Sequence, residues 1–163
     1  MVATRRALRF AVPLILLFIA GCAPAGPPYG AAESTIPPVP STMARVFLYR
    51  WLEPYDSIDP AVAYLNGKEV AVSSPGSVLY RDVAPGQYTI SVFSRGRAPD
   101  QFKTVVLRPG ETAYARIESA QSWQPCGGSG KAGTQGCDMT FVVVIVSPVV
   151  AQDEMRDLAF IHG

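Results

Sequence analysis

The fold of this 163-residue chain is decided by the stretch AVAYLNGKEVAV, residues 61–72. Two short runs of strand-forming residues flank Asn66-Gly67, and Asn and Gly tolerate the positive φ angles that a type I′ turn requires. The pattern predicts a two-residue β-hairpin in which Leu65 pairs with Lys68. We expect this register to place four residues on one face, toward the core: Ala63, Leu65, Val70 and Val72.

Strand-like segments continue on both sides of this hairpin. Residues 45–49 precede it, and residues 78–83, 87–93, 102–107 and 112–118 follow it, with Pro-Gly turns at Pro85-Gly86 and Pro109-Gly110. In the third of these segments, Tyr88, Ile90 and Val92 alternate with polar residues, which is typical of a strand with one solvated face. Short strands separated by turn residues predict a mainly β domain.

The last apolar run, residues 139–146, predicts a different kind of strand. It is apolar on both faces apart from Thr140, so we expect it in the centre of a sheet and covered on both sides. Ser147-Pro148 then resembles a helix start. A short amphipathic helix should follow, with Ala151, Met155, Leu158 and Ala159 on the side that covers the sheet or, alternatively, a partner.

The N-terminus has the pattern of an export signal. Arg5, Arg6 and Arg9 precede an apolar run that is too short to span a bilayer and that ends at Ile19-Ala20-Gly21-Cys22. This ending resembles the lipobox of bacterial lipoproteins, which implies removal of residues 1–21 and attachment of lipid to Cys22. Ala23 in place of Asp implies, by resemblance to sorted lipoproteins, the periplasmic face of the outer membrane. The alternative is an ordinary secretory peptide with a chance Cys.

Residues 22–42 are rich in Pro and Ala, and Tyr29 is their only aromatic residue. Such a composition cannot bury a core of its own. We expect a disordered tether, partly polyproline II, which would reach about 25 Å when coiled and about 60 Å when extended; a Pro-rich recognition segment is the alternative. Residues 43–163 then form one domain of ordinary size.

Residues 43–118 resemble a family. The residues that carry the likeness are 45–50, the Asn66-Gly67 hairpin, 83–90, and Pro109-Gly110-Glu111 before Tyr114. They resemble the domain of unknown function 2846 of bacterial lipoproteins. The resemblance implies a small antiparallel β-sandwich of prealbumin or immunoglobulin-like type without an established activity. The segment between Cys126 and Cys137 departs from the family pattern.

Charge gives little support to a nucleic-acid partner. Three of the 14 basic residues lie in the signal, whereas all 13 acidic residues follow it, which leaves the mature chain at −2. Proteins that follow a phosphate backbone carry a basic surface. We therefore expect no nucleic acid as a partner.

The Gly-rich segment between Cys126 and Cys137 suggests nucleotide binding at first sight. Gly128 to Gly133 matches G-x-G-x-x-G, but a dinucleotide site needs this motif between a strand and a helix of a βαβ unit, and the predicted strand 141–146 follows it instead. Pro125 and Ala132 break a P-loop. We expect no nucleotide and no cofactor. In an oxidising compartment the two thiols predict a disulfide, which would stabilise the domain by about 3 kcal/mol. A metal site is not expected, because His162 is the only His.

Candidate catalytic residues are few. His162 lies at the end of the printed sequence and is read as solvated, and no nucleophile elbow is present. Glu53, Asp56 and Asp59 form the acidic loop that an envelope hydrolase or a Ca²⁺ site would use, although a solvated loop fits their spacing better. No catalytic residue and no metal ligand is therefore assigned.

Three aromatic residues are the candidate ligand contacts. Trp51 and Tyr55 follow the end of a predicted strand, and Trp123 precedes the Cys segment. Exposed loop aromatics bind proteins or glycans, whereas the alternative places them in the core. We expect a non-enzymatic binding, structural or assembly module on a lipid anchor, with a carboxylate-dependent envelope hydrolase as the alternative.

Overall fold

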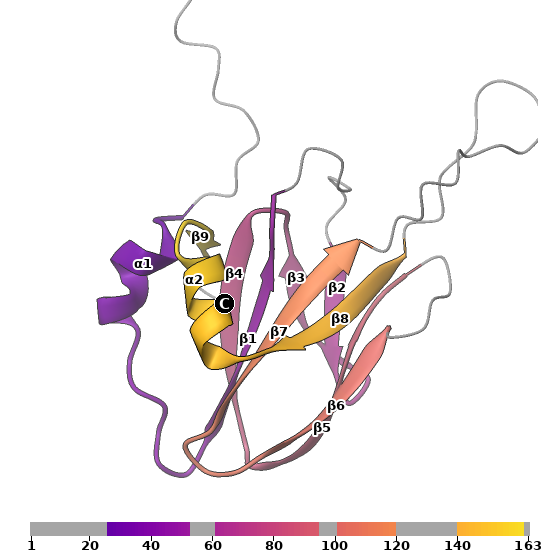
Figure 1. Ribbon diagram of the computed structural model, residues 1–163. Coiled ribbons are helices and arrows are strands. Elements are labelled where there is room, and N and C mark those ends of the chain that lie inside the picture. The colour runs from indigo at the N-terminus through magenta and orange to yellow at the C-terminus, as the bar shows by residue number, and fades with distance from the viewer. Residues whose placement is uncertain (1–25, 53–60, 95–100, 120–139, 162–163) are drawn as a thin grey trace, which may run out of the picture.

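The computed structural model describes residues 26–52, 61–94, 101–119 and 140–161, and they form a mainly β, sandwich-like fold of two sheets (Figure 1). The strands are β1 (Ala44–Arg50), β2 (Ala61–Leu65), β3 (Lys68–Ser73), β4 (Ser77–Val83), β5 (Gly86–Val92), β6 (Phe102–Leu107), β7 (Thr112–Ser119), β8 (Phe141–Val146) and β9 (Ala159–Phe160). One sheet has five strands in the order β8-β7-β1-β4-β9, and the other has four in the order β3-β2-β5-β6. The predicted mainly β class and two-sheet arrangement are confirmed.

The five-stranded sheet is mixed, so the prediction of a wholly antiparallel sandwich is wrong. β1 pairs in parallel with β7, and β4 pairs in parallel with β9. Both Pro-Gly turns carry the chain from one sheet to the other, from β4 to β5 and from β6 to β7, so β7 returns beside β1 in parallel; β9 reaches β4 after α2. At the second of these turns Gly110 has φ 78° and the Glu111 amide donates to the Arg108 carbonyl at 3.1 Å, as a type II turn requires.

The hairpin at Asn66-Gly67 forms as predicted, with φ 51° and 76° at its two turn residues and Leu65 opposite Lys68. The pairing then shifts by one residue, because Ala63 lies opposite Ala71. This β-bulge turns Ala71 into the core and Val72 outward, where it is 47% exposed. The predicted core face is therefore correct for Ala63 and Leu65, correct in part for Val70, which is half-buried against the core cluster, and wrong for Val72.

β1 is buried on both faces and separates two hydrophobic clusters. Val46 and Leu48 belong to the cluster between the two sheets. Phe47 and Tyr49 belong to the second cluster, which lies on the other side of the five-stranded sheet beneath the short helices. The molecule therefore has three layers, as Figure 1 shows.

The apolar strand β8 lies at the edge of the five-stranded sheet, so its predicted central position is wrong. Phe141 and Val143 are buried in the cluster between the sheets, and Val146 packs against the second cluster. Both faces of the strand thus meet apolar neighbours, as the sequence indicated. Hydrophobic periodicity indicates which faces of a strand are covered, but it does not indicate which strands lie beside it in the sheet.

The predicted C-terminal helix is present as α2 (Pro148–Met155) and covers the five-stranded sheet. Ala151 and Met155 are fully buried in the second cluster, and Leu158 is 9% exposed. Pro148 occupies the first turn as expected, but the Ser147 side chain makes no capping hydrogen bond. Within the described residues, no helix has the length and apolar character needed to cross a membrane.

The N-terminal segment requires a correction, because part of the predicted tether is folded onto the domain. Residues 29–35 form α1 (Tyr29–Ala32) and the 3₁₀ helix η1 (Glu33–Thr35). Tyr29 is 4% exposed and its ring lies 5.7 Å from that of Phe47 and 6.3 Å from that of Phe160, between ring centres. A Pro-rich segment cannot build a core, but its single aromatic residue can be buried in a cluster that other strands supply.

Candidate binding surface

The outward face of the four-stranded sheet carries large hydrophobic side chains. On the inward face, Ala63, Leu65 and Ile90 are buried in the core. On the outward face, Val72, Phe93, Phe102 and Val106 are 47%, 57%, 63% and 68% exposed. We call this surface the outer sheet face; it consists of Val62, Tyr64, Glu69, Val72, Gln87, Thr89, Ser91, Phe93, Phe102, Thr104 and Val106.

Strand pairing places these hydrophobic residues side by side. Val62 lies opposite Val72 on one neighbouring strand, and on the other side its carbonyl accepts a hydrogen bond from the Phe93 amide at 2.8 Å. In the next row Ser91 lies between Tyr64 and Phe102. Residues that face each other across a strand pair have Cβ atoms about 5 Å apart, so these two rows form one surface. Val106 lies on the same face but opposite Gln87, and Thr104 separates it from Phe102.

This surface departs from what an antiparallel sheet normally shows to water. The outward positions of such a sheet are usually polar, whereas Glu69 is the only charged residue at the described positions of this face. The opposite sheet is covered by α1 and α2, and no described element covers the outer sheet face in the same way (Figure 1). Contiguous exposed apolar surface of this kind typically marks an interaction site.

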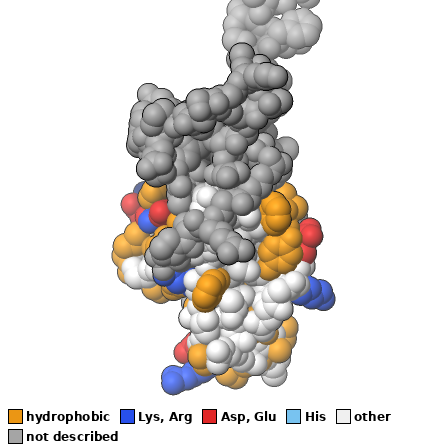
Figure 2. All heavy atoms as spheres, turned by 90° about the vertical axis from the view of Figure 1, so that its right-hand side faces the viewer, with side chains coloured by type: hydrophobic (Ala, Val, Ile, Leu, Met, Phe, Trp, Pro, Cys, Tyr) orange, Lys and Arg blue, Asp and Glu red, His pale blue; other side chains and the backbone are white. Residues whose placement is uncertain are grey.

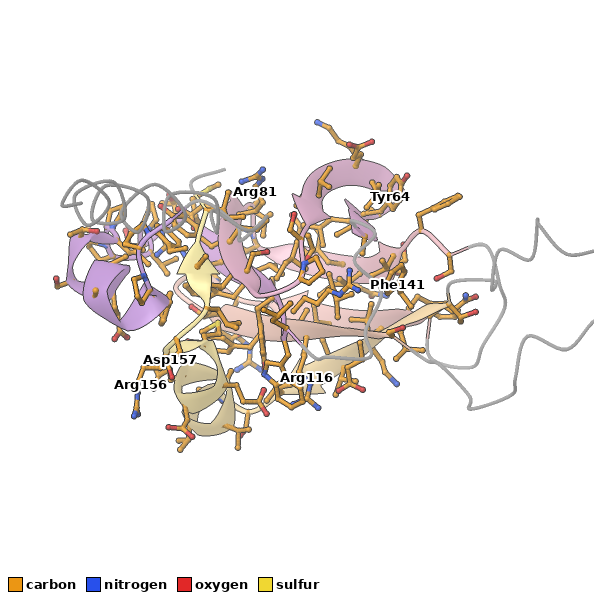
Figure 3. The ribbon with its side chains drawn as sticks, turned by 90° about the horizontal axis from the view of Figure 1, so that it is seen from above. Tyr64, Arg81, Arg116, Phe141, Arg156 and Asp157 are labelled. Atoms are coloured by element: carbon orange, nitrogen blue, oxygen red, sulfur yellow. The ribbon has the colours of Figure 1, made fainter. Side chains whose placement is uncertain are left out.

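The views from the side and from above agree with this arrangement. Figure 2 looks onto the edge strands β6 and β8 and shows hydrophobic side chains gathered at both sides of the molecule. In Figure 3, Tyr64 lies on the side of the four-stranded sheet, and Arg116 and Arg156 lie on the side of α2. Arg116 and Arg156 are therefore separated from Tyr64 by the thickness of the sandwich, whereas Arg81 lies on the side of Tyr64 and donates to the Val70 carbonyl of β3 at 2.8 Å.

Trp51, one of the predicted ligand contacts, takes part in the packing of the domain. It follows β1, is partly buried against the second cluster, and lies under the guanidinium of Arg116, which is 4.2 Å from the ring centre. One face of its ring is therefore occupied by a cation–π contact within the fold.

Arg116 also centres a group of charged residues that joins β7, α2 and β1. Its Nη1 lies 2.5 Å from Glu154 Oε1, and its Nε donates to Glu118 Oε1 at 2.6 Å. The Tyr49 hydroxyl donates to Glu154 Oε2 at 2.6 Å. Burial, together with this hydrogen bond, raises the pKa of Tyr49 far above its usual range. Because each of these groups is engaged by another, the arrangement holds α2 on the sheet rather than offering a reactive group.

An open groove of about 810 Å³ lies between α1 and α2. Its lining includes Tyr29, Glu33, Asp153, Glu154 and Arg156. Glu154 is held by Arg116, and Asp153 lies 3.0 Å from Arg156. Within the described part of the chain, no three His, Cys, Asp or Glu side chains come together to hold a metal ion. The groove therefore does not gather free polar groups around one point.

The remaining sequence-predicted residues lie outside the described part of the chain. These are Cys22, Tyr55, Trp123, Cys126, Cys137 and His162, together with Glu53, Asp56 and Asp59. The strands on either side of this part of the chain are placed, since β7 and β8 pair antiparallel with Ser119 opposite Phe141. The disulfide between Cys126 and Cys137 stays a prediction.

No family model matches the sequence, and no curated protein is significantly similar to it. The resemblance to the domain of unknown function 2846 therefore stays an expectation. Sequence reasoning missed the outer sheet face because both sets of alternating positions in β6 contain hydrophobic residues, Phe102 and Val106 on one side and Val105 and Leu107 on the other. The only available signal was this two-sided apolar character.

Proposed function

We propose that this protein is a lipoprotein of the cell envelope, anchored through Cys22 in the outer membrane, and that it acts as a non-enzymatic binding module. The binding surface is the outer sheet face, and its partner is another envelope protein. The observation that carries the proposal is the exposure of Val72, Phe93, Phe102 and Val106 on one nearly uncharged sheet surface. Removing apolar surface from water contributes about 25 cal/mol per Å², from which the costs of association are subtracted.

The chemistry of this face favours a protein over a glycan. Sugar rings present many hydroxyl groups that need polar partners when they leave water. Five of the eleven side chains of the outer sheet face are valine or phenylalanine, and this apolar share suits a protein partner; the polar groups belong to Tyr64, Glu69, Gln87, Thr89, Ser91 and Thr104. Four strands of about six residues cover roughly 400 Å². A face of this size fits within a standard protein interface, which buries about 800 Å² on each partner.

The anchor is supported by the sequence. Arg5, Arg6 and Arg9, the short apolar run and the ending Ile19-Ala20-Gly21-Cys22 agree with one another as a lipoprotein signal. The resemblance of residues 43–118 to a domain of bacterial lipoproteins, of prealbumin or immunoglobulin-like type, supports the same placement. The carboxylates of the alternative hydrolase, Glu53, Asp56 and Asp59, lie outside the described residues, and no described contact favours that alternative.

The test is site-specific photocrosslinking in intact cells, with the photoreactive amino acid at Val106 or, as the matched control, at Val149. Both valines are well exposed, at 68% and 79%, but Val149 lies on α2 on the opposite side of the molecule. We expect one specific protein adduct at Val106 and none of the same mass at Val149.

A double variant, Phe102→Ser with Val106→Ser, should abolish that adduct when the crosslinker stands at Phe93. The unfolding midpoint should change little, since both side chains are already exposed in the free protein. The same adducts at Val106 and Val149, or an adduct that persists in the folded double variant, would overturn the assignment of this face.

A further inference from the structure

The N-terminal segment is attached to the fold very close to the predicted lipid site. The Phe160 amide donates to the Pro27 carbonyl at 2.8 Å, and the Tyr29 amide donates to the Leu158 carbonyl at 2.8 Å. Pro28 and Ala159 form an antiparallel bridge. A Cβ atom at Gly26 would collide with the Phe160 carbonyl. The chain is thus bound to β9 from residue 26 onward.

Side chains hold the same segment along its whole length. Tyr29 is buried between Phe47 and Phe160. Ile36 packs against the second cluster, and the Pro37 carbonyl accepts a hydrogen bond of 2.8 Å from Arg45 Nη1. We call residues 26–37 the docked segment. Its attachment at both ends means that it cannot serve as spacer while the domain is folded.

The free length of the anchor follows from the covalent geometry of the chain. Five residue steps separate Cys22 from Pro27. At no more than 3.6 Å for each step, these steps span at most about 18 Å, compared with about 60 Å for the whole Pro-rich stretch when extended. A lipid on Cys22 would therefore keep Pro27 within about 18 Å of the membrane surface.

The docking point lies at one end of the sandwich. Pro28 is bridged to Ala159, Ala159 pairs with Ser77, and Ser77 pairs with Arg50, the last residue of β1. The Asn66-Gly67 and Pro109-Gly110 turns lie at the opposite end (Figure 1). The strands run between these two ends, and a strand of seven residues such as β1 spans about 23 Å.

We propose that the docked segment shortens the anchor so that the sandwich stands on the membrane with the carboxyl end of β1 toward the bilayer. The outer sheet face then points sideways, within about 40 Å of the membrane surface, the sum of the anchor and strand lengths. The partner of this face is accordingly a protein embedded in or anchored to the same membrane. This inference rests on the proposed lipidation of Cys22.

The test measures the height of two positions above the bilayer by energy transfer to an acceptor lipid. The full mature lipoprotein, with its acyl chains verified by mass, is reconstituted into phosphatidylethanolamine and phosphatidylglycerol vesicles. A fluorescent amino acid replaces Asp157, which is exposed beside the docking point, or Lys68, which is exposed at the turn end. A matched variant carries twenty Gly and Ser residues inserted between Ala25 and Gly26, which lengthens the anchor without changing the docked segment.

We expect clearly stronger transfer from position 157 than from position 68, and loss of most of this difference when the spacer is inserted. Equal transfer from both positions, or transfer from position 157 that does not change with the spacer, would overturn the proposal. A chain without acyl groups would instead contradict the proposed anchor, and an unchanged adduct in the Phe102→Ser, Val106→Ser variant would contradict the proposed binding face. The three failures are therefore distinguishable.

Discussion

At the scale of single residues, Arg116 shows how α2 is held on the five-stranded sheet. Its guanidinium contacts two carboxylates and the ring of Trp51, and its side chain is 16% exposed. Glu154, on α2, is 15% exposed and also accepts a hydrogen bond from Tyr49. A charge that is this deeply placed is stabilised mainly by its partner, because water reaches it poorly.

Replacing Arg116 by Met should therefore lower the free energy of unfolding by about 3 kcal/mol, because Glu154 keeps its charge and loses its counterion. The double variant Arg116→Met, Glu154→Met should recover part of that loss, since no unpaired charge remains at the buried position of Glu154. Glu118 also loses its counterion but is 34% exposed to water, and the Tyr49 hydroxyl loses its acceptor. Urea unfolding of the wild type, both single variants and the double variant measures the coupling directly.

The matched control is Arg108→Met. Arg108 lies 4.0 Å from Glu111, but the two side chains are 82% and 44% exposed. Such a pair contributes at most about 1 kcal/mol. If Arg108→Met destabilised the protein as much as Arg116→Met, burial would not be the cause of the effect.

At the scale of elements, the docked segment depends on a neutral tyrosine. Burial raises the pKa of Tyr29 to about 12, and the nearby Glu33 carboxylate acts in the same direction. In the unfolded chain a tyrosine ionises near pH 10. The stability that Tyr29 contributes is therefore complete below pH 10 and is lost as the pH rises toward 12, because the unfolded chain releases the proton first.

We expect the free energy of unfolding to fall between pH 10 and pH 12, by up to about 1.4 kcal/mol per pH unit for each such tyrosine. Tyr29→Phe keeps the ring and removes the hydroxyl. Its free energy of unfolding should therefore fall less steeply with pH, because one ionising group fewer contributes to the slope. Urea titrations followed by circular dichroism at several pH values give both slopes. Identical slopes for the two proteins would show that Tyr29 is not protected from ionisation in the fold.

At the scale of the whole molecule, two hydrophobic clusters share the five-stranded sheet but differ in how they are closed. The cluster between the sheets is enclosed by long strands. The second cluster is closed by α1, the eight-residue helix α2 and the two-residue strand β9. Elements held by few backbone hydrogen bonds open locally at lower free energy than the core sheet.

We therefore expect two levels of protection against amide hydrogen exchange, a lower one in the layer of α1, α2 and β9 and a higher one in the core strands. The amides of Tyr29 and Phe160 should exchange through openings several kcal/mol less costly than those that expose Leu48, since the docked segment and β9 can detach while β1 stays paired with β4 and β7. Exchange measured by nuclear magnetic resonance tests this. The same opening free energy at all three amides would mean that the layers unfold as one unit.

Local patterns in the sequence determined the strands, the Asn66-Gly67 turn, the type II turn at Pro109-Gly110 and the C-terminal helix. Each of these depends on neighbouring residues, whose φ preferences and hydrophobic periodicity can be read along the chain. The candidate surface was not among them, because Phe102 and Val106 alternate with Val105 and Leu107, and both sets are suited to a core.

Only the tertiary structure decided which strands pair, that β8 lies at an edge, that Val72 faces outward and that Tyr29 is buried. These features depend on contacts between residues far apart in the sequence, such as Tyr29 with Phe160 and Ser77 with Arg50. The composition of a segment indicates which of its side chains could be buried, whereas the surface against which they pack is formed by other parts of the chain. For this reason a Pro-rich stretch with one tyrosine had the pattern of a tether and yet became part of the domain.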